Sequence, residues 1–143
     1  MIERDDVMPL LLAACPSFQE TWREIEAKHS LEDDEGEENR RLHYSDAGRF
    51  AHHLVELHRK GATAEIAAAM QVIERLHLEG EHYVQELATI GYLEDIQNVA
   101  RNSDDVDPAV FVPYLGPESR RWWNGLNEFW HGGETSVHPI DDD

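Results

Sequence analysis

Cysteine is nearly absent from this chain, which has Cys15 alone among its 143 residues. A single thiol excludes an internal disulfide and a zinc site built from several cysteines. Cys15 ends the apolar run 8–15, directly before a proline, and desolvation in such a stretch keeps a thiol protonated and unreactive. We therefore expect Cys15 to be structural and the chain to work in the reducing cytoplasm.

Positive charge is also scarce, because 12 Lys and Arg face 30 Asp and Glu, for a net charge of −18. That excess of negative charge opposes binding to phosphate backbones and anionic lipid, so nucleic acid and membrane are excluded as partners. The apolar run 8–15 is far shorter than the ~20 residues that span a bilayer. Acids precede it where a signal peptide needs basic residues. A basic protein is the partner that this composition favours.

The motifs that identify common catalytic sites are missing. The sequence contains no G-x-x-x-x-G-K-[ST], no G-x-G-x-x-G and no H-E-x-x-H, which excludes the usual phosphate-binding loops and the helical zinc protease site. Ser45 and Ser119 lack a nucleophile elbow. We expect no catalytic residues and no cofactor.

What is present is helical periodicity, with almost no strand-like alternation. A helix is expected from about 46 to 60, and its apolar stripe consists of Ala47, Phe50, Ala51, Leu54, Val55 and Leu57. Another is expected over 64–79, with Ile66, Met70, Ile73 and Leu76 at spacings of three and four. In a third, over 81–102, apolar residues that include Ile90 cover more than half of the circumference, which indicates a central helix. Short links between them predict antiparallel hairpins. The fold class is therefore all-α: a single compact helical bundle over 1–143, built from helix hairpins, with about five to seven helices.

Tryptophan is concentrated in "GPESRRWWNGLNEFWHGG", residues 116–133. At about 100° per residue, its large apolar side chains fall on an arc of about 120°. They are Trp122, Trp123, Leu126, Phe129 and Trp130. This stripe is typical of a terminal helix packed on a bundle. Trp123 and Trp130 lie at its edge, so we expect them to be partly exposed and able to anchor a partner.

Negative charge is densest in the segment "SLEDDEGEENRR", which cannot bury itself. We expect an exposed acidic loop over 30–41 that steers a basic partner toward the chain. The steering residues are Glu32, Asp33, Asp34, Glu35, Glu37 and Glu38. Residues 134–143 are expected to form a flexible acidic tail. Its aspartates, with those at 104–107, would extend the same field if they lie on the same side.

Nine histidines suggest an alternative function. His52 and Glu56 form an i,i+4 pair, and two E-x-x-H elements place His77 and His82 near Glu74 and Glu79. Paired E-x-x-H elements are typical of di-iron bundles, but there they lie on separate helices. The alternative is a metal or small-ligand site that uses His52, Glu56, His77 and His82.

Four stretches together resemble a family of small bacterial helical proteins that is known only as a domain of unknown function. They are "VMPLLLAACPSFQETW", "GRFAHHLVELHRKG", "IERLHLEGEHYVQELATIGYLEDIQN" and "YLGPESRRWWNGLNEFW". The resemblance covers nearly the whole chain except the acidic loop and the tail, and it implies no catalytic residues. In size, acidity and helical content the chain is also similar to immunity proteins of bacterial toxin systems.

Three hypotheses follow. The favoured one is a non-enzymatic acidic protein-binding module, in the form of an immunity protein that binds and occludes a cognate toxin. The second is the metal or small-ligand site just described. The third is a structural role with no ligand, which requires that no large apolar patch be exposed.

Overall fold

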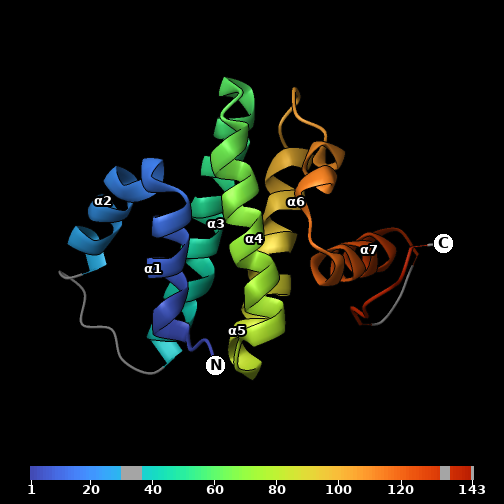
Figure 1. The fold of residues 1–143 in the computed structure, drawn as a ribbon, viewed down its shortest axis with the longest axis horizontal. Coiled ribbons are helices and arrows are strands. Elements are labelled where there is room, and N and C mark those ends of the chain that lie inside the picture. Colours follow the sequence, from blue (N-terminus) through green and yellow to red (C-terminus); the bar gives the residue numbers. More distant parts are fainter. Residues whose placement is uncertain (30–36, 133–135, 143) are drawn as a thin grey trace.

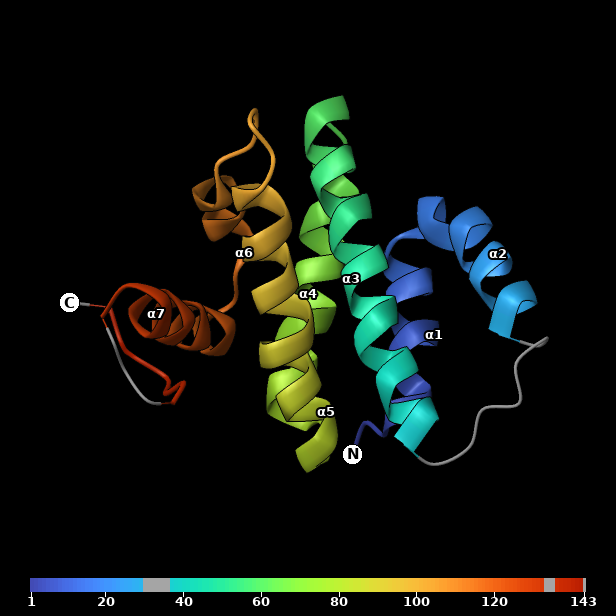
Figure 2. The same cartoon turned by 180° about the vertical axis from the view of Figure 1, so that it is seen from behind.

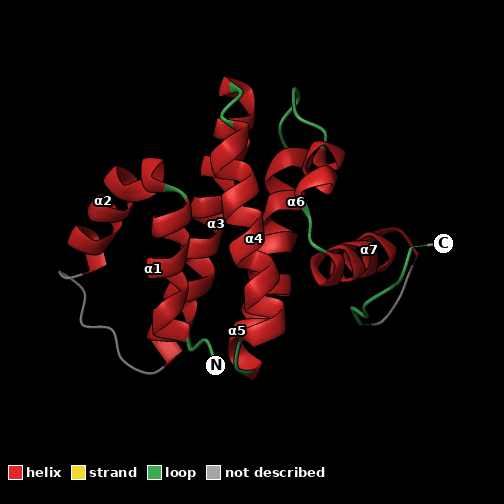
Figure 3. Cartoon of the chain, viewed as in Figure 1, coloured by secondary structure: helices red, strands yellow, loops and turns green. Residues whose placement is uncertain are grey.

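The fold is all-α, as predicted, and a computed structural model describes residues 1–29, 37–132 and 136–142. The described chain contains seven α-helices, one π-helical segment and two 3₁₀-helical segments, and Figure 3 shows only helices and loops in it. In chain order they are α1 (Arg4–Ala14), η1 (Pro16–Phe18), α2 (Gln19–His29), α3 (Glu37–Lys60), α4 (Thr63–Glu79), α5 (His82–Glu86), η2 (Leu87–Leu93), α6 (Glu94–Arg101), η3 (Pro108–Tyr114) and α7 (Pro117–Gly132).

Two long central helices, α3 and α4, organise the bundle (Figure 1). They form the expected hairpin, since α3 ends at Gly61, whose φ of 74° is the left-handed conformation that closes a helix. The backbone N–H of Ala62 then donates to the carbonyl of Leu57 at 2.9 Å. Seen from both sides, α1 and α6 flank this pair, and α2 and α7 lie outermost at opposite ends (Figure 2).

The core lies where these helices face one another. The apolar stripe predicted on α3 is fully or almost fully buried, as is that on α4. Its members are Ala47, Phe50, Ala51, Leu54, Val55 and Leu57 on α3, and Ile66, Met70, Ile73 and Leu76 on α4. Burial of each large aliphatic side chain contributes roughly 2 kcal/mol to the free energy of folding. Periodicity alone therefore identified the faces that hold the bundle together.

The start of α3 corrects one expectation. The sequence placed this helix from about Asp46, after an exposed loop over 30–41, whereas the described backbone is already helical at Glu37. The charged residues at 37–41 are compatible with a helix, because Glu and Arg have high helix propensity. A run of polar residues was read as a loop although its backbone propensity favours helix.

The N-terminus is held by a short backbone bridge. The N–H of Ile2 donates to the carbonyl of Glu79 at 2.8 Å, and the N–H of Glu81 donates to the carbonyl of Ile2 at 2.9 Å. Ile2 is buried as a result. This bridge fixes the turn between α4 and α5, which forms one end of the pocket described below.

Candidate binding pocket

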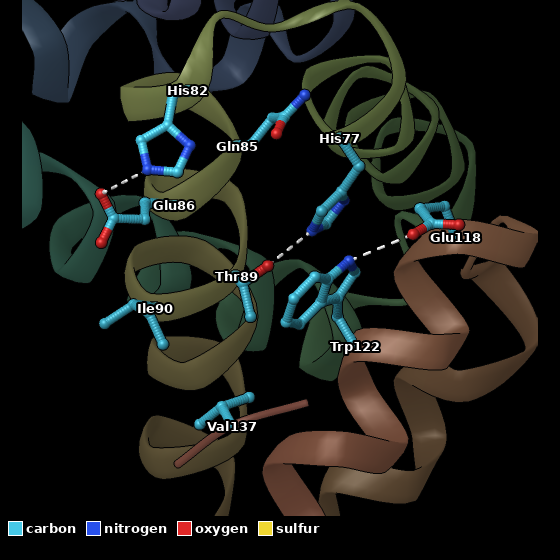
Figure 4. A pocket seen from close by; sticks show the side chains of 9 residues that line it. All are labelled: His77, His82, Gln85, Glu86, Thr89, Ile90, Glu118, Trp122 and Val137. Atoms are coloured by element: carbon cyan, nitrogen blue, oxygen red, sulfur yellow. Dashed lines mark hydrogen bonds and ion pairs between the residues drawn. The ribbon is translucent and has the colours of Figure 1, made fainter. Parts of the chain in front are cut away.

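A pocket of about 510 Å³ lies where α4, α5, η2 and α7 meet (Figure 4). That volume is within the ~300–1,000 Å³ of small-molecule sites. Side chains from four helical elements and from the C-terminal tail line it. They are His77, His82, Gln85, Glu86, Thr89, Ile90, Glu118, Trp122 and Val137.

The wall formed by η2 is a π-helical turn within one continuous helix from His82 to Arg101. Such turns are rare and occur frequently at functional sites, because i→i+5 hydrogen bonding changes the direction in which side chains point. Here it buries Thr89, whose exposed fraction is 4%, and leaves Ile90 38% exposed at the pocket. The α-helical period had predicted Ile90 as one of the buried residues of a central helix.

The floor of the pocket is the buried imidazole of His77, which is held at both nitrogens. Its Nε2 lies 2.9 Å from the Thr89 hydroxyl, and its Nδ1 lies 3.1 Å from the Ile73 carbonyl and 3.2 Å from the Ser119 hydroxyl. The carbonyl can only accept, so we assign the proton of neutral His77 to Nδ1, and Nε2 then accepts from Thr89. Burial lowers the pKa of His77 below its ordinary value of 6.5, which keeps the ring neutral.

Glu74 fixes α7 against α4. Its carboxylate accepts hydrogen bonds from the backbone N–H groups of Glu118 at 3.0 Å and Ser119 at 2.8 Å, in the first turn of α7. These are two of the donors that a helix start leaves without a partner. Gly116, the residue directly before α7, has no side chain, and a Cβ there would lie 2.6 Å from Cγ of Glu74. Glycine at 116 therefore makes room for a cap supplied by another helix.

Glu118 and Trp122 form the α7 wall. The indole Nε1–H of Trp122 donates to Oε1 of Glu118 at 3.2 Å, which orients the ring along the pocket (Figure 4). Arg121 contacts the same carboxylate at 3.0 and 3.1 Å without lining the pocket. Across the pocket, Glu86 lies 4.0 Å from His82. Among the described residues, two carboxylates and no Lys or Arg line the pocket.

The four residues of the metal alternative do not come together in the described chain. His52 and Glu56 lie on α3 and do not line the pocket, and Glu56 is paired with Arg59 at 3.0 Å. His77 and His82 do lie at the pocket, but both nitrogens of His77 already have partners. No three His, Cys, Asp or Glu side chains come together as a metal site requires, within the ranges that the structure describes. The i,i+4 pair of His52 and Glu56 lies on α3, whereas His77 on α4 and His82 on α5 line the pocket.

The two tryptophans predicted as anchors differ in exposure. Trp123 is 3% exposed and packs in the core, so the prediction that its side chain can anchor a partner is wrong. Trp130 is 46% exposed and stacks edge-on against Phe129 with ring centres 5.3 Å apart. Trp122, which the helical projection placed within the buried stripe, lines the pocket instead. The only sequence signal for its role was the i,i+4 spacing from Glu118.

The predicted steering residues fall mostly outside the described chain. Glu32, Asp33, Asp34 and Glu35 lie there entirely, and Glu37 and Glu38 form the first turn of α3, with only their backbone described. Both views place α2 and the start of α3 on the far side of the bundle from α7 (Figures 1 and 2).

Three of the aspartates expected to extend this field are paired with arginines. Asp105 accepts from Arg59 at 2.8 and 2.9 Å. Asp141 accepts from Arg121 at 2.6 Å, and Asp142 lies 3.2 Å from Arg120. The negative charge of these three carboxylates is therefore offset locally by arginines.

The described part of the tail, 136–142, lies against α7. The N–H of Ile140 donates to the carbonyl of Arg121 at 2.8 Å, and the amide of Asn124 donates to the carbonyl of Ile140 at 3.0 Å. The His138 carbonyl packs onto Gly125 so closely that any Cβ there would meet it. These contacts bring Val137 to the pocket.

Cys15 is structural, as its sequence context indicated. Its side chain is fully buried, and burial raises the pKa of the thiol to about 11. At neutral pH it is a protonated thiol in the core, and it makes no contribution to the pocket.

The described chain is therefore an all-α helical protein with a pocket between α4, α5, η2 and α7. The chain belongs to the family described as "Domain of unknown function (DUF7674)", whose model matches residues 8–131. No curated protein and no solved structure matches the chain significantly. No helix in the described ranges has the length and apolar character needed to cross a membrane. Val137 lies beyond the matched span, so one pocket wall is outside the family model.

Proposed function

We propose that this chain is a non-enzymatic binding module for a basic protein, in the form of an immunity protein that occludes a cognate bacterial toxin in the cytoplasm. The observation that carries the proposal is the pocket beside α7. Two carboxylates and a tryptophan line it without a Lys or Arg in the described lining, and Arg121 pairs with one of the two, Glu118, from outside. A chain of net charge −18 presents this pocket to its surroundings. Cationic groups are the chemistry that such a site attracts.

The proposed mechanism has two steps. The overall negative charge raises the encounter rate with a basic partner, by orders of magnitude at low ionic strength. A few buried anchors then supply most of the affinity. Trp122 in the pocket and exposed Trp130 are suited to that role, and they replace the anchor first predicted at Trp123.

Two features of the site favour binding over catalysis. Ser119, whose hydroxyl lies 3.2 Å from the His77 imidazole, is fully buried and out of reach of a substrate. The imidazole is engaged at both nitrogens and does not hold a proton ready for transfer to a ligand. A general acid or base needs hydrogen-bond access to the reacting group, so the pair supports a structural role under the pocket.

The second candidate function is binding of a free small ligand in the same pocket. Its volume of about 510 Å³ favours this candidate, since that space suits a small molecule as well as a side chain. Two residues of the predicted His and Glu set, His77 and His82, contribute to the lining.

Co-expression tests the proposal. The product of the gene directly upstream is expressed in a bacterial host alone, with this chain, and with its Trp122→Ala or Glu20→Gln variant. We expect the upstream product to arrest growth, and the wild-type chain and Glu20→Gln to restore it. We expect Trp122→Ala, at equal soluble level, to restore growth less. An upstream product that is harmless, or that arrests growth despite the chain, overturns the immunity function.

A further inference from the structure

We propose that the pocket between α5, η2 and α7 binds a guanidinium group, stacked on the Trp122 ring and hydrogen-bonded to the carboxylates and amide around it. This deepens the proposed function, on which its biological setting rests, by naming the group of the partner that enters the pocket: an arginine side chain. The binding chemistry itself follows from the lining.

The polar groups of the lining are mainly hydrogen-bond acceptors. Gln85 uses its Nε2 to donate to the carbonyl of Gly80 at 3.1 Å, so its Oε1 is the end left to accept. The Thr89 hydroxyl donates its hydrogen bond to Nε2 of His77, so the Thr89 oxygen can still accept a hydrogen bond from a ligand. Glu86 has a longer contact, 4.0 Å to His82. A ligand that complements this set must bring several N–H donors.

The donors of the lining are few. His82 is 89% exposed in its side chain and lies at the rim beside Glu86. The indole N–H of Trp122 is already used by Glu118. An anionic ligand would face Glu86 and also Glu118, whose charge Arg121 offsets from outside the lining, with no Lys or Arg among the described lining residues. The pocket therefore disfavours phosphate and carboxylate ligands.

The shape of the lining favours a planar cation on an aliphatic stem. Trp122 is held by its hydrogen bond to Glu118, so its face is a preformed platform. Guanidinium stacks on aromatic rings and forms paired hydrogen bonds with a carboxylate, whereas ammonium is a compact, strongly hydrated point charge. Ile90 and Val137 supply apolar surface on the same side of the pocket for the methylene stem (Figure 4).

A titration followed by two-dimensional ¹H–¹⁵N NMR tests the proposal. The probe is n-butylguanidinium, and its uncharged counterpart is n-butylurea, which has nearly the same shape. The Trp122 indole signal is assigned by its loss in Trp122→Phe. We expect n-butylguanidinium to shift the Trp122 indole and the backbone signals of Glu86 and Ile90, with saturation, and n-butylurea to bind at least ~5-fold more weakly.

Variants locate the site. Glu86→Gln removes a lining carboxylate and should weaken binding of n-butylguanidinium roughly 3- to 10-fold. Glu20→Gln is the matched control, since it changes the net charge equally on exposed α2 and should leave the affinity unchanged. Trp122→Ala should weaken binding most and Trp122→Phe less, because a phenyl ring is a poorer cation platform. If Trp122→Ala does not fold, the other variants still decide the outcome.

A second titration, with a peptide, distinguishes an arginine of a protein from a free guanidinium compound as the natural occupant of the pocket. If the natural occupant is an arginine of a protein, acetyl-Gly-Arg-Gly-amide should bind more tightly than n-butylguanidinium, because its amides add contacts at the rim. Tighter binding of n-butylguanidinium assigns the pocket to a free small guanidinium compound and overturns the partner arginine.

Equal affinity for n-butylguanidinium and n-butylurea, or equal losses in Glu86→Gln and Glu20→Gln, overturns the guanidinium site. That failure is separate from failure of the immunity function, which co-expression measures without any small probe.

Discussion

Replacement of Gly116 by alanine should destabilise the protein through a side chain on another helix. The φ of Gly116 is not in the left-handed region, so alanine is acceptable to the backbone itself. Its methyl group, however, would occupy the position of the Glu74 side chain, 2.6 Å from Cγ. Because that side chain is flexible, we expect Glu74 to swing away and leave the start of α7 without its cap.

The magnitude follows from the two hydrogen bonds that are lost. Glu74 accepts from the N–H groups of Glu118 and Ser119 at 3.0 and 2.8 Å. A hydrogen bond to a charged group contributes about 1.5–3 kcal/mol when buried. Because Glu74 is only half-buried, we discount each bond for solvent screening to about 1 kcal/mol, which gives about 2 kcal/mol for the pair. Alanine at 116 also restricts the unfolded chain, which returns about 0.5 kcal/mol. The net loss should be about 1.5 kcal/mol.

A double-mutant cycle measured by urea unfolding separates this cause from simple strain. Gly116→Ala should cost about 1.5 kcal/mol in the wild-type chain, but be neutral or slightly stabilising when Glu74 is already alanine, for a coupling of about 2 kcal/mol.

Gly48→Ala is the control glycine. Its new Cβ would meet only Asp95 at an ordinary 3.5 Å, so we expect it to stabilise α3 by roughly 0.5–1 kcal/mol. Additive losses for Gly116→Ala and Glu74→Ala would refute the reasoning.

Three further outcomes follow from the structure. Cys15, buried and with its pKa raised to about 11, should react with a thiol reagent at pH 8 only as fast as the chain unfolds; rapid labelling of the native protein would contradict this. Burial lowers the pKa of His77 below 6.5 in the folded chain, so the unfolded chain takes up a proton at a higher pH than the folded chain does. The wild type should therefore lose stability relative to His77→Gln as the pH falls below about 6.5. Parallel urea-unfolding profiles of the two proteins between pH 7.5 and 5 would count against it. Gly125→Ala should push the His138 carbonyl off α7 and speed amide hydrogen exchange at 136–142, and unchanged exchange there would be inconsistent with the packed tail.

The helices were predictable because their apolar spacing reports burial directly. Phe50 and Leu54 on α3, and Ile73 and Leu76 on α4, recur at threes and fours and are all fully buried. The hydrophobic effect favours burial of apolar side chains, so their regular spacing identifies the helix face that packs in the core. The same reasoning correctly assigned Cys15 to the core.

The pocket was not predictable, because it depends on contacts between residues far apart in the chain. Glu74 and Gly116 determine how α7 is placed, although α5, η2, α6 and η3 all lie between them in the chain. A helical projection finds the centre of an apolar arc but not the neighbour that covers it, so it could not tell buried Trp123 from pocket-lining Trp122. The π-helical turn at Ile90 further breaks the 3.6-residue period on which the projection relies.

The acidic groups show a second limit. Sequence counts charges but does not pair them, so Asp105 and Asp141 looked free although arginines hold both. The sequence also did not single out the pocket carboxylates, because Glu86 and Glu118 are only two of 30 acidic residues. Only their position around Trp122 distinguishes them.

The most direct test of the central idea is an intermolecular NOE measurement on the chain with bound n-butylguanidinium. Contacts should appear between the ligand methylenes and the ring protons of Trp122, together with the methyl groups of Ile90 and Val137. Contacts confined to other surfaces of the bundle, with the Trp122 ring protons unaffected at saturation, would contradict a cation-binding pocket on this protein.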